Sequence, residues 1–127
     1  MPNKILTTLE ALIIDDETDI CYLLSNILKQ KKVHSIFAGS LSEADAILHA
    51  EFSPHFIFLD NYLPDGLGIS YIRTLKKKYP ASKIVMITAH DNTSDRQKAK
   101  QEGADFFIGK PFSRNLIFKT LEEVGGQ

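Results

Sequence analysis

Five polar residues that follow apolar runs could carry out chemistry together. They are Asp15, Asp16, Asp60, Thr88 and Lys110. If the apolar runs are strands of one parallel sheet, their carboxyl ends meet at one edge, where open parallel sheets bind ligands. Carboxylates crowded at such an edge repel one another, and burial at a strand end also disfavours the charged form of Asp60. The group therefore requires cations.

Lys110 supplies one positive charge, and a divalent metal ion supplies the rest. A site of carboxylates, a carbonyl and water suits Mg²⁺, and Mn²⁺ also takes oxygen ligands. With such an ion bound, Lys110 and the Thr88 hydroxyl can hold phosphoryl oxygens while a carboxylate oxygen of Asp60 attacks phosphorus in line. The predicted product is an aspartyl phosphate.

The elements that position these residues alternate between strand and helix patterns. Apolar runs typical of strands buried on both faces occur at 12–14, 35–38, 56–59, 84–87 and 106–108. Each run is followed by a stretch with helical spacing. In the first stretch, the apolar stripe consists of Ile20, Leu23, Leu24, Ile27 and Leu28.

The other helical stretches have recognisable ends. Ser40–Glu43 forms a capping box at the start of the second, and Pro80 lies where the third stops. The fourth, 94–102, has Ala99 as its only apolar side chain, which predicts a weakly packed helix. Ser113 could cap the fifth.

Strands separated by helices predict right-handed crossovers, parallel strands and helices on both faces of one sheet. The fold class is therefore α/β, a single doubly wound (βα)5 sheet of the flavodoxin-like kind. Five units favour the strand order 2-1-3-4-5 over the six-stranded dinucleotide-binding order. We expect residues 9–124 to form the domain, 1–8 an N-terminal extension, and 125–127 a C-terminal tail or the stub of a linker.

Composition limits the classes of function. The 127 residues fit one domain, and 15 Lys and Arg against 16 Asp and Glu disfavour direct nucleic-acid binding. Cys21 is the only cysteine, so neither an internal disulfide nor a cysteine metal cluster can form. No apolar run approaches the ~20 residues of a membrane span. We therefore expect a cytoplasmic protein without a membrane partner.

Five motifs, in order along the chain, resemble those of the response-regulator receiver domain, the CheY-like phosphoacceptor module of two-component signalling. They are Ile13–Glu17, Phe58–Asp60 followed by Leu63–Gly68, Val85–Ala89, Gly103–Asp105, and Lys110–Phe112. Together they cover nearly the whole chain. The resemblance implies that Asp60 is the phosphoacceptor and Asp16 a direct metal ligand. It also implies that Asp15 acts through water on the metal and that the backbone carbonyl of Tyr62 is a further ligand.

The resemblance also implies a switch. Thr88 is the hydroxyl that follows the phosphoryl group, Lys110 is its counter-charge, and the Lys110–Pro111 bond is cis. Phe107 takes the place of the switch aromatic, so phosphorylation would change the face of the fourth helix, fifth strand and fifth helix. Large side chains at Tyr62 and His90 flank the path of the hydrolytic water and should slow loss of the phosphate.

The implied partners follow from this chemistry. A histidine kinase or histidine phosphotransfer protein donates the phosphoryl group, and a downstream effector protein or domain reads the switched face. A homodimer of the phosphorylated state is compatible with the resemblance. Such a module catalyses its own phosphorylation and dephosphorylation without being a turnover enzyme.

Other interpretations of the same residues stay open. Asp15 and Asp16 could be helix-capping acids, Phe107 ordinary core, and His90 a solvated loop residue. Gly66 and Gly68 could supply positive φ angles to a turn that includes Asp65.

Two rival functions stay open as well. An aspartyl-phosphate phosphatase of the haloacid dehalogenase type needs a second carboxylate two residues after the nucleophile, where this sequence has Tyr62. A receiver fold that binds proteins without being phosphorylated is the other alternative.

Overall fold

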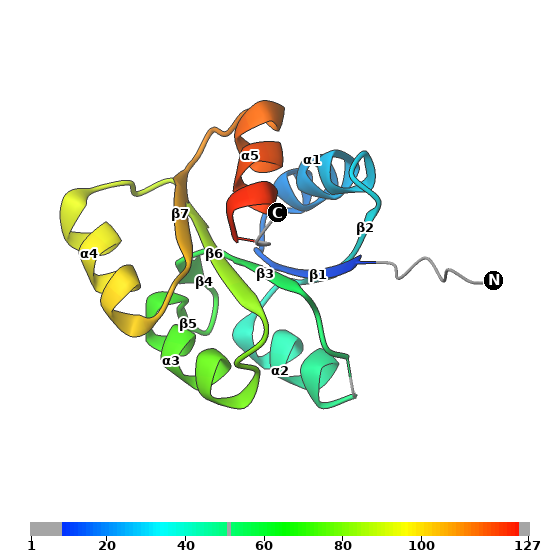
Figure 1. Ribbon diagram of the computed structural model, residues 1–127. Helices are drawn as coiled ribbons and strands as arrows, with labels where there is room; N and C mark the ends of the chain where they lie inside the picture. Colours follow the sequence, from blue (N-terminus) through cyan, green and yellow to red (C-terminus); the bar gives the residue numbers. More distant parts are fainter. Residues whose placement is uncertain (1–8, 51, 125–127) are drawn as a thin grey trace.

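A five-stranded parallel sheet forms the centre of the protein (Figure 1). The computed structural model describes residues 9–50 and 52–124, so the expected extension at 1–8 and tail at 125–127 lie outside the described residues. The strands are β1 (Leu9–Ile14), β2 (Val33–Ala38), β3 (Phe56–Leu59), β4 (Tyr62–Leu63), β5 (Gly66–Leu67), β6 (Lys83–Thr88) and β7 (Phe106–Gly109). The helices are α1 (Thr18–Lys29), α2 (Leu41–His49), α3 (Ile69–Lys78), α4 (Thr93–Glu102) and α5 (Arg114–Val124).

The large sheet has the order β2-β1-β3-β6-β7, and all its neighbouring strands are parallel. Counted over these five strands, this is the predicted order 2-1-3-4-5, and the predicted α/β fold class is confirmed. The central strands are apolar at consecutive positions because both faces of the sheet are covered. Residues 11–14 and 56–59 are at most 4% exposed.

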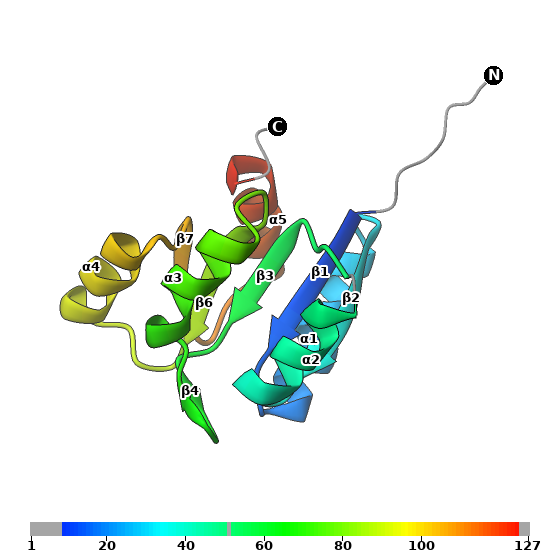
Figure 2. The ribbon, with the colours of Figure 1, turned by 90° about the horizontal axis from the view of Figure 1, so that it is seen from below.

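Helices α1 and α5 cover one face of the sheet, and α2, α3 and α4 cover the other (Figures 1 and 2). Leu24 and Ile117 pack on the first face, and Ile72 packs on the second. The prediction that Leu23 belongs to the buried stripe of α1 is wrong: Leu23 is 48% exposed, because successive residues of a helix point about 100° apart. None of the described helices is long and apolar enough to cross a membrane.

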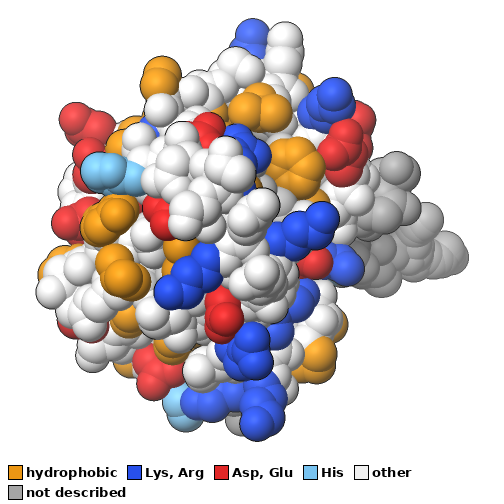
Figure 3. Space-filling model, turned by 90° about the vertical axis from the view of Figure 1, so that its left-hand side faces the viewer, with side chains coloured by type: hydrophobic (Ala, Val, Ile, Leu, Met, Phe, Trp, Pro, Cys, Tyr) orange, Lys and Arg blue, Asp and Glu red, His pale blue; other side chains and the backbone are white. Residues whose placement is uncertain are grey.

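Helix α4 buries little apolar surface, as its sequence predicts. Ala99 is its only buried residue. The helix is fixed instead at its ends, where the Asn92 side chain accepts a hydrogen bond from the Asp95 amide and Gly103 adopts a left-handed conformation with φ of 117°. Charged side chains of both signs are spread over the side of the molecule that carries α4 (Figure 3). Polar contacts therefore account for much of what holds this helix.

Strands β4 and β5 form a short antiparallel hairpin between β3 and α3, which the sequence pattern does not indicate. Gly66 has φ of 153°, as its place in the turn predicts. The expectation of a positive φ at Gly68 is wrong, because its φ is −57°. A side chain at Gly68 would instead collide with the backbone carbonyl of Asp60. This glycine therefore allows α3 to begin directly against the end of β3.

Candidate functional site

The register of the sheet brings the ends of four strands together. Strands β1 and β3 end at the same level, so Asp15 and Asp60 leave neighbouring strands side by side. Strands β6 and β7 also end together, and the Lys110 amide donates to the Thr88 carbonyl at 2.8 Å. One cavity at this edge is lined by residues that include Asp16, Asp60, Tyr62, Thr88, His90 and Lys110.

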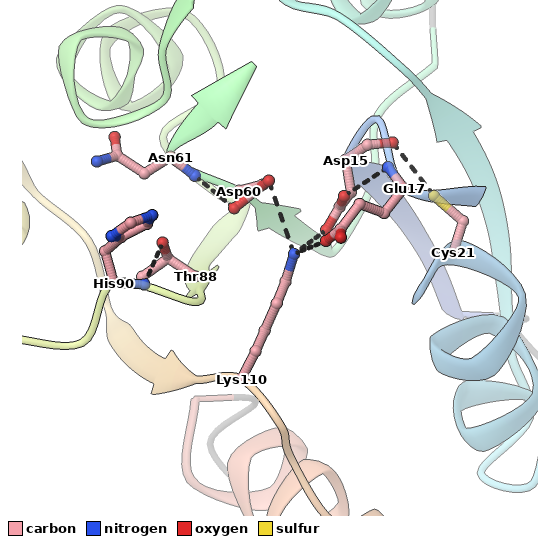
Figure 4. Close-up of polar contacts among 8 residues, drawn as sticks. All are labelled: Asp15, Glu17, Cys21, Asp60, Asn61, Thr88, His90 and Lys110. Atoms are coloured by element: carbon pink, nitrogen blue, oxygen red, sulfur yellow. Dashed lines mark hydrogen bonds and ion pairs between the residues drawn. The ribbon is translucent and has the colours of Figure 1, made fainter. Parts of the chain in front are cut away.

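The ammonium group of Lys110 lies among three carboxylates (Figure 4). Its Nζ is 2.6 Å from Glu17 Oε1, 2.9 Å from Asp15 Oδ2 and 3.7 Å from Asp60 Oδ2. The side chain is only 9% exposed. Lys110 therefore pairs most closely with Asp15 and Glu17. Sequence reasoning quoted Glu17 within a motif but gave it no role.

The protonation of Asp60 reflects this crowding. Its pKa is raised from 3.8 to about 6, by burial first and by the charge of Asp15 second. Lys110 and the backbone amide of Asn61, which donates to Asp60 Oδ1 at 2.9 Å, act in the opposite direction. For Lys110, burial lowers the pKa, but its hydrogen bonds to Glu17 and Asp15 outweigh that effect and raise it. The site thus contains more negative charge than its single lysine neutralises.

Three carboxylates are close enough to share a metal ion. Asp15, Asp16 and Asp60 each offer an oxygen, and these oxygens lie within 4.8 Å of one another. Carboxylate oxygens are the ligand atoms that Mg²⁺ and Mn²⁺ prefer, and a cation would offset the repulsion among three carboxylates this close together. The residues present therefore fit such an ion.

A family model for the response regulator receiver domain matches residues 11–122. The chain belongs to this family. Phosphate regulon transcriptional regulatory protein PhoB of Escherichia coli is 35% identical over 115 residues, which are 89% of this chain and 50% of PhoB. Nitrogen assimilation regulatory protein NtrX of Azorhizobium caulinodans is 35% identical over 118 residues, which are 89% of this chain and 25% of NtrX. This receiver domain thus spans a quarter to a half of the length of these relatives.

Solved structures agree with the family. The beryllofluoride-activated NtrC4 receiver domain dimer is 34% identical, with a TM-score of 0.84, 91% of this chain covered and 94% of that one. A CheY-like receiver domain protein from Methanospirillum hungatei JF-1 is 26% identical, with a TM-score of 0.85 and coverage of 92% and 93%. The expected CheY-like fold and family are confirmed.

Two aromatic rings that line the cavity around Asp60 lie together. The rings of Tyr62 and His90 have centroids 4.4 Å apart. The His90 amide donates to Thr88 Oγ1 at 3.2 Å, and the Thr88 side chain is buried. Tyr62 is 49% exposed. The two residues expected to flank the water path therefore contact each other beside the hydroxyl.

Phe107 lies half-buried on β7, and the peptide bond between Lys110 and Pro111 is cis. The Arg96 guanidinium lies over the Phe107 ring, 4.8 Å from its centroid. It also donates to both carboxylate oxygens of Asp91, at 2.6 and 3.0 Å. Sequence reasoning missed Arg96 and Asp91, because nothing in their spacing indicates which ring or strand they face.

Sequence reasoning also missed Asn61. It is buried, and its side-chain oxygen accepts a hydrogen bond from the backbone amide of Ile69 at 3.0 Å. The backbone amide of Asn61 donates to Asp60 Oδ1. Asn61 therefore joins the start of α3 to the end of β3. An asparagine directly after an apolar run is a signal for such a turn, and it could have been used.

Proposed function

We propose that this receiver domain is a phosphorylation-dependent switch of a two-component phosphorelay. In this proposal Asp60 accepts a phosphoryl group from a phosphohistidine of a histidine kinase or histidine phosphotransfer protein. One observation carries the proposal: Asp60, Thr88 and Lys110 line the same cavity, and oxygens of two further carboxylates, Asp15 and Asp16, lie within 4.8 Å of an Asp60 oxygen. Membership of the receiver family supports it.

The oxygen donors suit Mg²⁺, with Mn²⁺ as a substitute. Asp16, Asp60 and the backbone carbonyl of Tyr62 would hold the ion, and Asp15 would act through water. When bound, the ion offsets negative charge on the phosphoryl oxygens.

Asp60 is the nucleophile in the proposed transfer. One of its carboxylate oxygens forms the new O–P bond as the N–P bond of the phosphohistidine breaks, and the imidazole nitrogen keeps the electron pair. Lys110 exchanges part of its pairing with Asp15 and Glu17 for a phosphoryl oxygen, and the Thr88 hydroxyl donates to another. In this way the domain catalyses its own phosphorylation and, later, hydrolysis of the aspartyl phosphate. It does not turn over a free substrate.

Tyr62 and His90 act on the lifetime of the phosphate. Their contacting rings lie at the pocket that a hydrolytic water must enter. Two large side chains there narrow the approach in line with phosphorus, so we propose a phosphorylated state that lasts minutes or more.

Phosphorylation is transmitted to the face formed by α4, β7 and α5. Movement of Thr88 toward the phosphoryl group vacates space that the Phe107 ring enters, and a downstream effector protein or domain reads the result. A homodimer is one form this output can take, because the beryllofluoride-activated NtrC4 receiver domain is a dimer. We place the reaction in the cytoplasm, where a free buried thiol such as Cys21 stays reduced.

Phosphorylation with acetyl phosphate, or binding of beryllofluoride, tests the proposal with and without Mg²⁺. We expect the unmodified protein to be labelled only with the metal ion, and Asp60→Asn not to be labelled. Asp19→Asn is a matched control, because Asp19 is an exposed carboxylate on α1 and should leave labelling unchanged. Labelling that persists in Asp60→Asn, or that ignores removal of Mg²⁺, would overturn the proposal. Absence of labelling under all conditions would favour a receiver fold that binds proteins without phosphorylation.

A further inference from the structure

Asp65 links the β4–β5 hairpin to helix α2, and nothing in the proposed chemistry uses it. The sequence indicated only a turn at this position. Its Oδ1 accepts a hydrogen bond from the Leu41 amide and its Oδ2 from the Ser42 amide, both at 2.9 Å. These are the first two amides of α2, which have no partner within the helix. Both hydrogen bonds hold the pKa of the Asp65 carboxyl below its usual value, and the bond from Leu41 has the larger effect.

Packing alone holds the hairpin weakly. It consists of two residue pairs, Tyr62 with Leu67 and Leu63 with Gly66, and only the Leu63 side chain is buried. An isolated hairpin of this size is marginal in water. At Gly66 the backbone approaches α2 so closely that an added Cβ would lie 3.1 Å from a methyl carbon of Leu41. The tip of the hairpin thus rests on the start of α2, and the carboxylate fixes it there.

The other end of the hairpin is Tyr62, two residues after Asp60. We propose that Asp65 is a positioning residue of the phosphorylation site: by tying the hairpin tip to α2, it fixes the backbone of Tyr62. This inference rests on the proposed function, because the carbonyl of Tyr62 matters there as a metal ligand. Asp65 would thus affect metal binding through the backbone, without touching the ion.

A simpler role, in which Asp65 only stabilises α2, predicts different behaviour. Ser40 separates the two roles, because its Oγ caps the same helix end by accepting from the Glu43 amide at 3.1 Å and has no bond to the hairpin. Loss of either cap weakens the start of α2. Only loss of Asp65 frees the hairpin.

The experiment compares Asp65→Ala, Asp65→Asn and Ser40→Ala with the unmodified protein. Amide hydrogen exchange of the hairpin residues other than Pro64, which has no N–H, is measured by NMR in the metal-free protein. The Mg²⁺ dissociation constant is measured by calorimetry. In Asp65→Ala we expect faster exchange across the hairpin and Mg²⁺ affinity about tenfold lower, at the low end for groups that orient metal ligands. Asp65→Asn retains one acceptor and should give smaller changes in the same direction. Ser40→Ala should change neither quantity.

Unchanged hairpin exchange in Asp65→Ala and Asp65→Asn would overturn the inference, as would equal effects from Ser40→Ala. If Asp65→Ala does not fold, Asp65→Asn carries the test. Failure of the unmodified protein to bind Mg²⁺ would count against the proposed function, whereas the exchange measurement in metal-free protein would still decide whether Asp65 holds the hairpin.

Discussion

The Arg96 guanidinium covers the ring of Phe107 from helix α4, 4.8 Å from the ring centroid, while it pairs with Asp91. We predict that Phe107 is the switch aromatic, so a cation lies over the ring that is expected to move. Asp91 also lies against the backbone of Gly109, where an added Cβ would be 2.6 Å from its carboxylate. Arg96 therefore joins α4 to β7 at a place where α4 itself contributes little apolar packing.

Replacement of Arg96 by alanine should favour the activated state. The guanidinium stabilises the Phe107 ring in the position that it has without a phosphoryl group, so its loss should raise beryllofluoride affinity about two- to fivefold, the equivalent of an exposed cation–π contact. Titration of the Mg²⁺-loaded protein, followed by NMR, measures this affinity. Arg73→Ala is the control, because Arg73 pairs with Glu102 of α4, whereas the cation over the Phe107 ring is Arg96. Equal or weaker affinity in Arg96→Ala would contradict the assigned role.

The Tyr62 and His90 pair should slow hydrolysis of the aspartyl phosphate. Replacing both rings with alanine opens the pocket beside Thr88, so we expect the first-order rate of dephosphorylation to rise by at least about tenfold, which is 1.4 kcal/mol of barrier. The rate is measured after removal of acetyl phosphate. Tyr22→Ala removes an exposed aromatic of α1 and serves as the control. An unchanged rate in the double variant would show that the rings do not restrict water.

The sequence was sufficient to predict the five-stranded sheet and most of the residues that line the pocket, for physical reasons. Strands buried on both faces must be apolar at consecutive positions, as Phe56–Leu59 are, and this pattern is local. The strand order was inferred from the number of units, which favours 2-1-3-4-5 without fixing it. The meeting of Asp15, Asp60 and Lys110 follows from parallel strands that end at one edge.

Contacts between distant segments could not be predicted in the same way. Glu17 is as close to Lys110 as any carboxylate in the site, yet its place depends on the rotamers of two long side chains. Arg96 reaches Phe107 only because of the particular orientation of α4. Gly68 resembled a turn glycine, but a glycine is needed there because any side chain would collide with the backbone of Asp60. No local sequence pattern expresses this steric constraint.

Gly68→Ala should therefore disturb the site even though its φ of −57° suits alanine. The new methyl group must displace the Asp60 backbone, so we expect a loss of about 1–3 kcal/mol in the free energy of unfolding, typical of overpacking. Urea denaturation measures this loss, and Gly39→Ala is the control because its Cβ would meet only ordinary contacts. A stability within error of the unmodified protein would show that α3 can shift away at no cost.

The lowered pKa of Asp65 predicts a pH dependence of stability that is separate from metal binding. Its carboxylate gains two hydrogen bonds on folding, so the folded protein binds this proton less tightly than the unfolded chain, whose value is near 3.8. The stabilisation is complete above the unfolded value and is lost as pH falls through 3.8 toward the folded value. Asp65→Asn should thus be less stable than the unmodified protein at pH 7, and the difference should shrink below about pH 4. Urea denaturation without metal measures the stability of both proteins as a function of pH.

Ser40→Ala is the control. Its loss of stability should not depend on pH, since a hydroxyl does not titrate in this range. A pH-independent loss of stability in Asp65→Asn as well would contradict the role of the Asp65 charge.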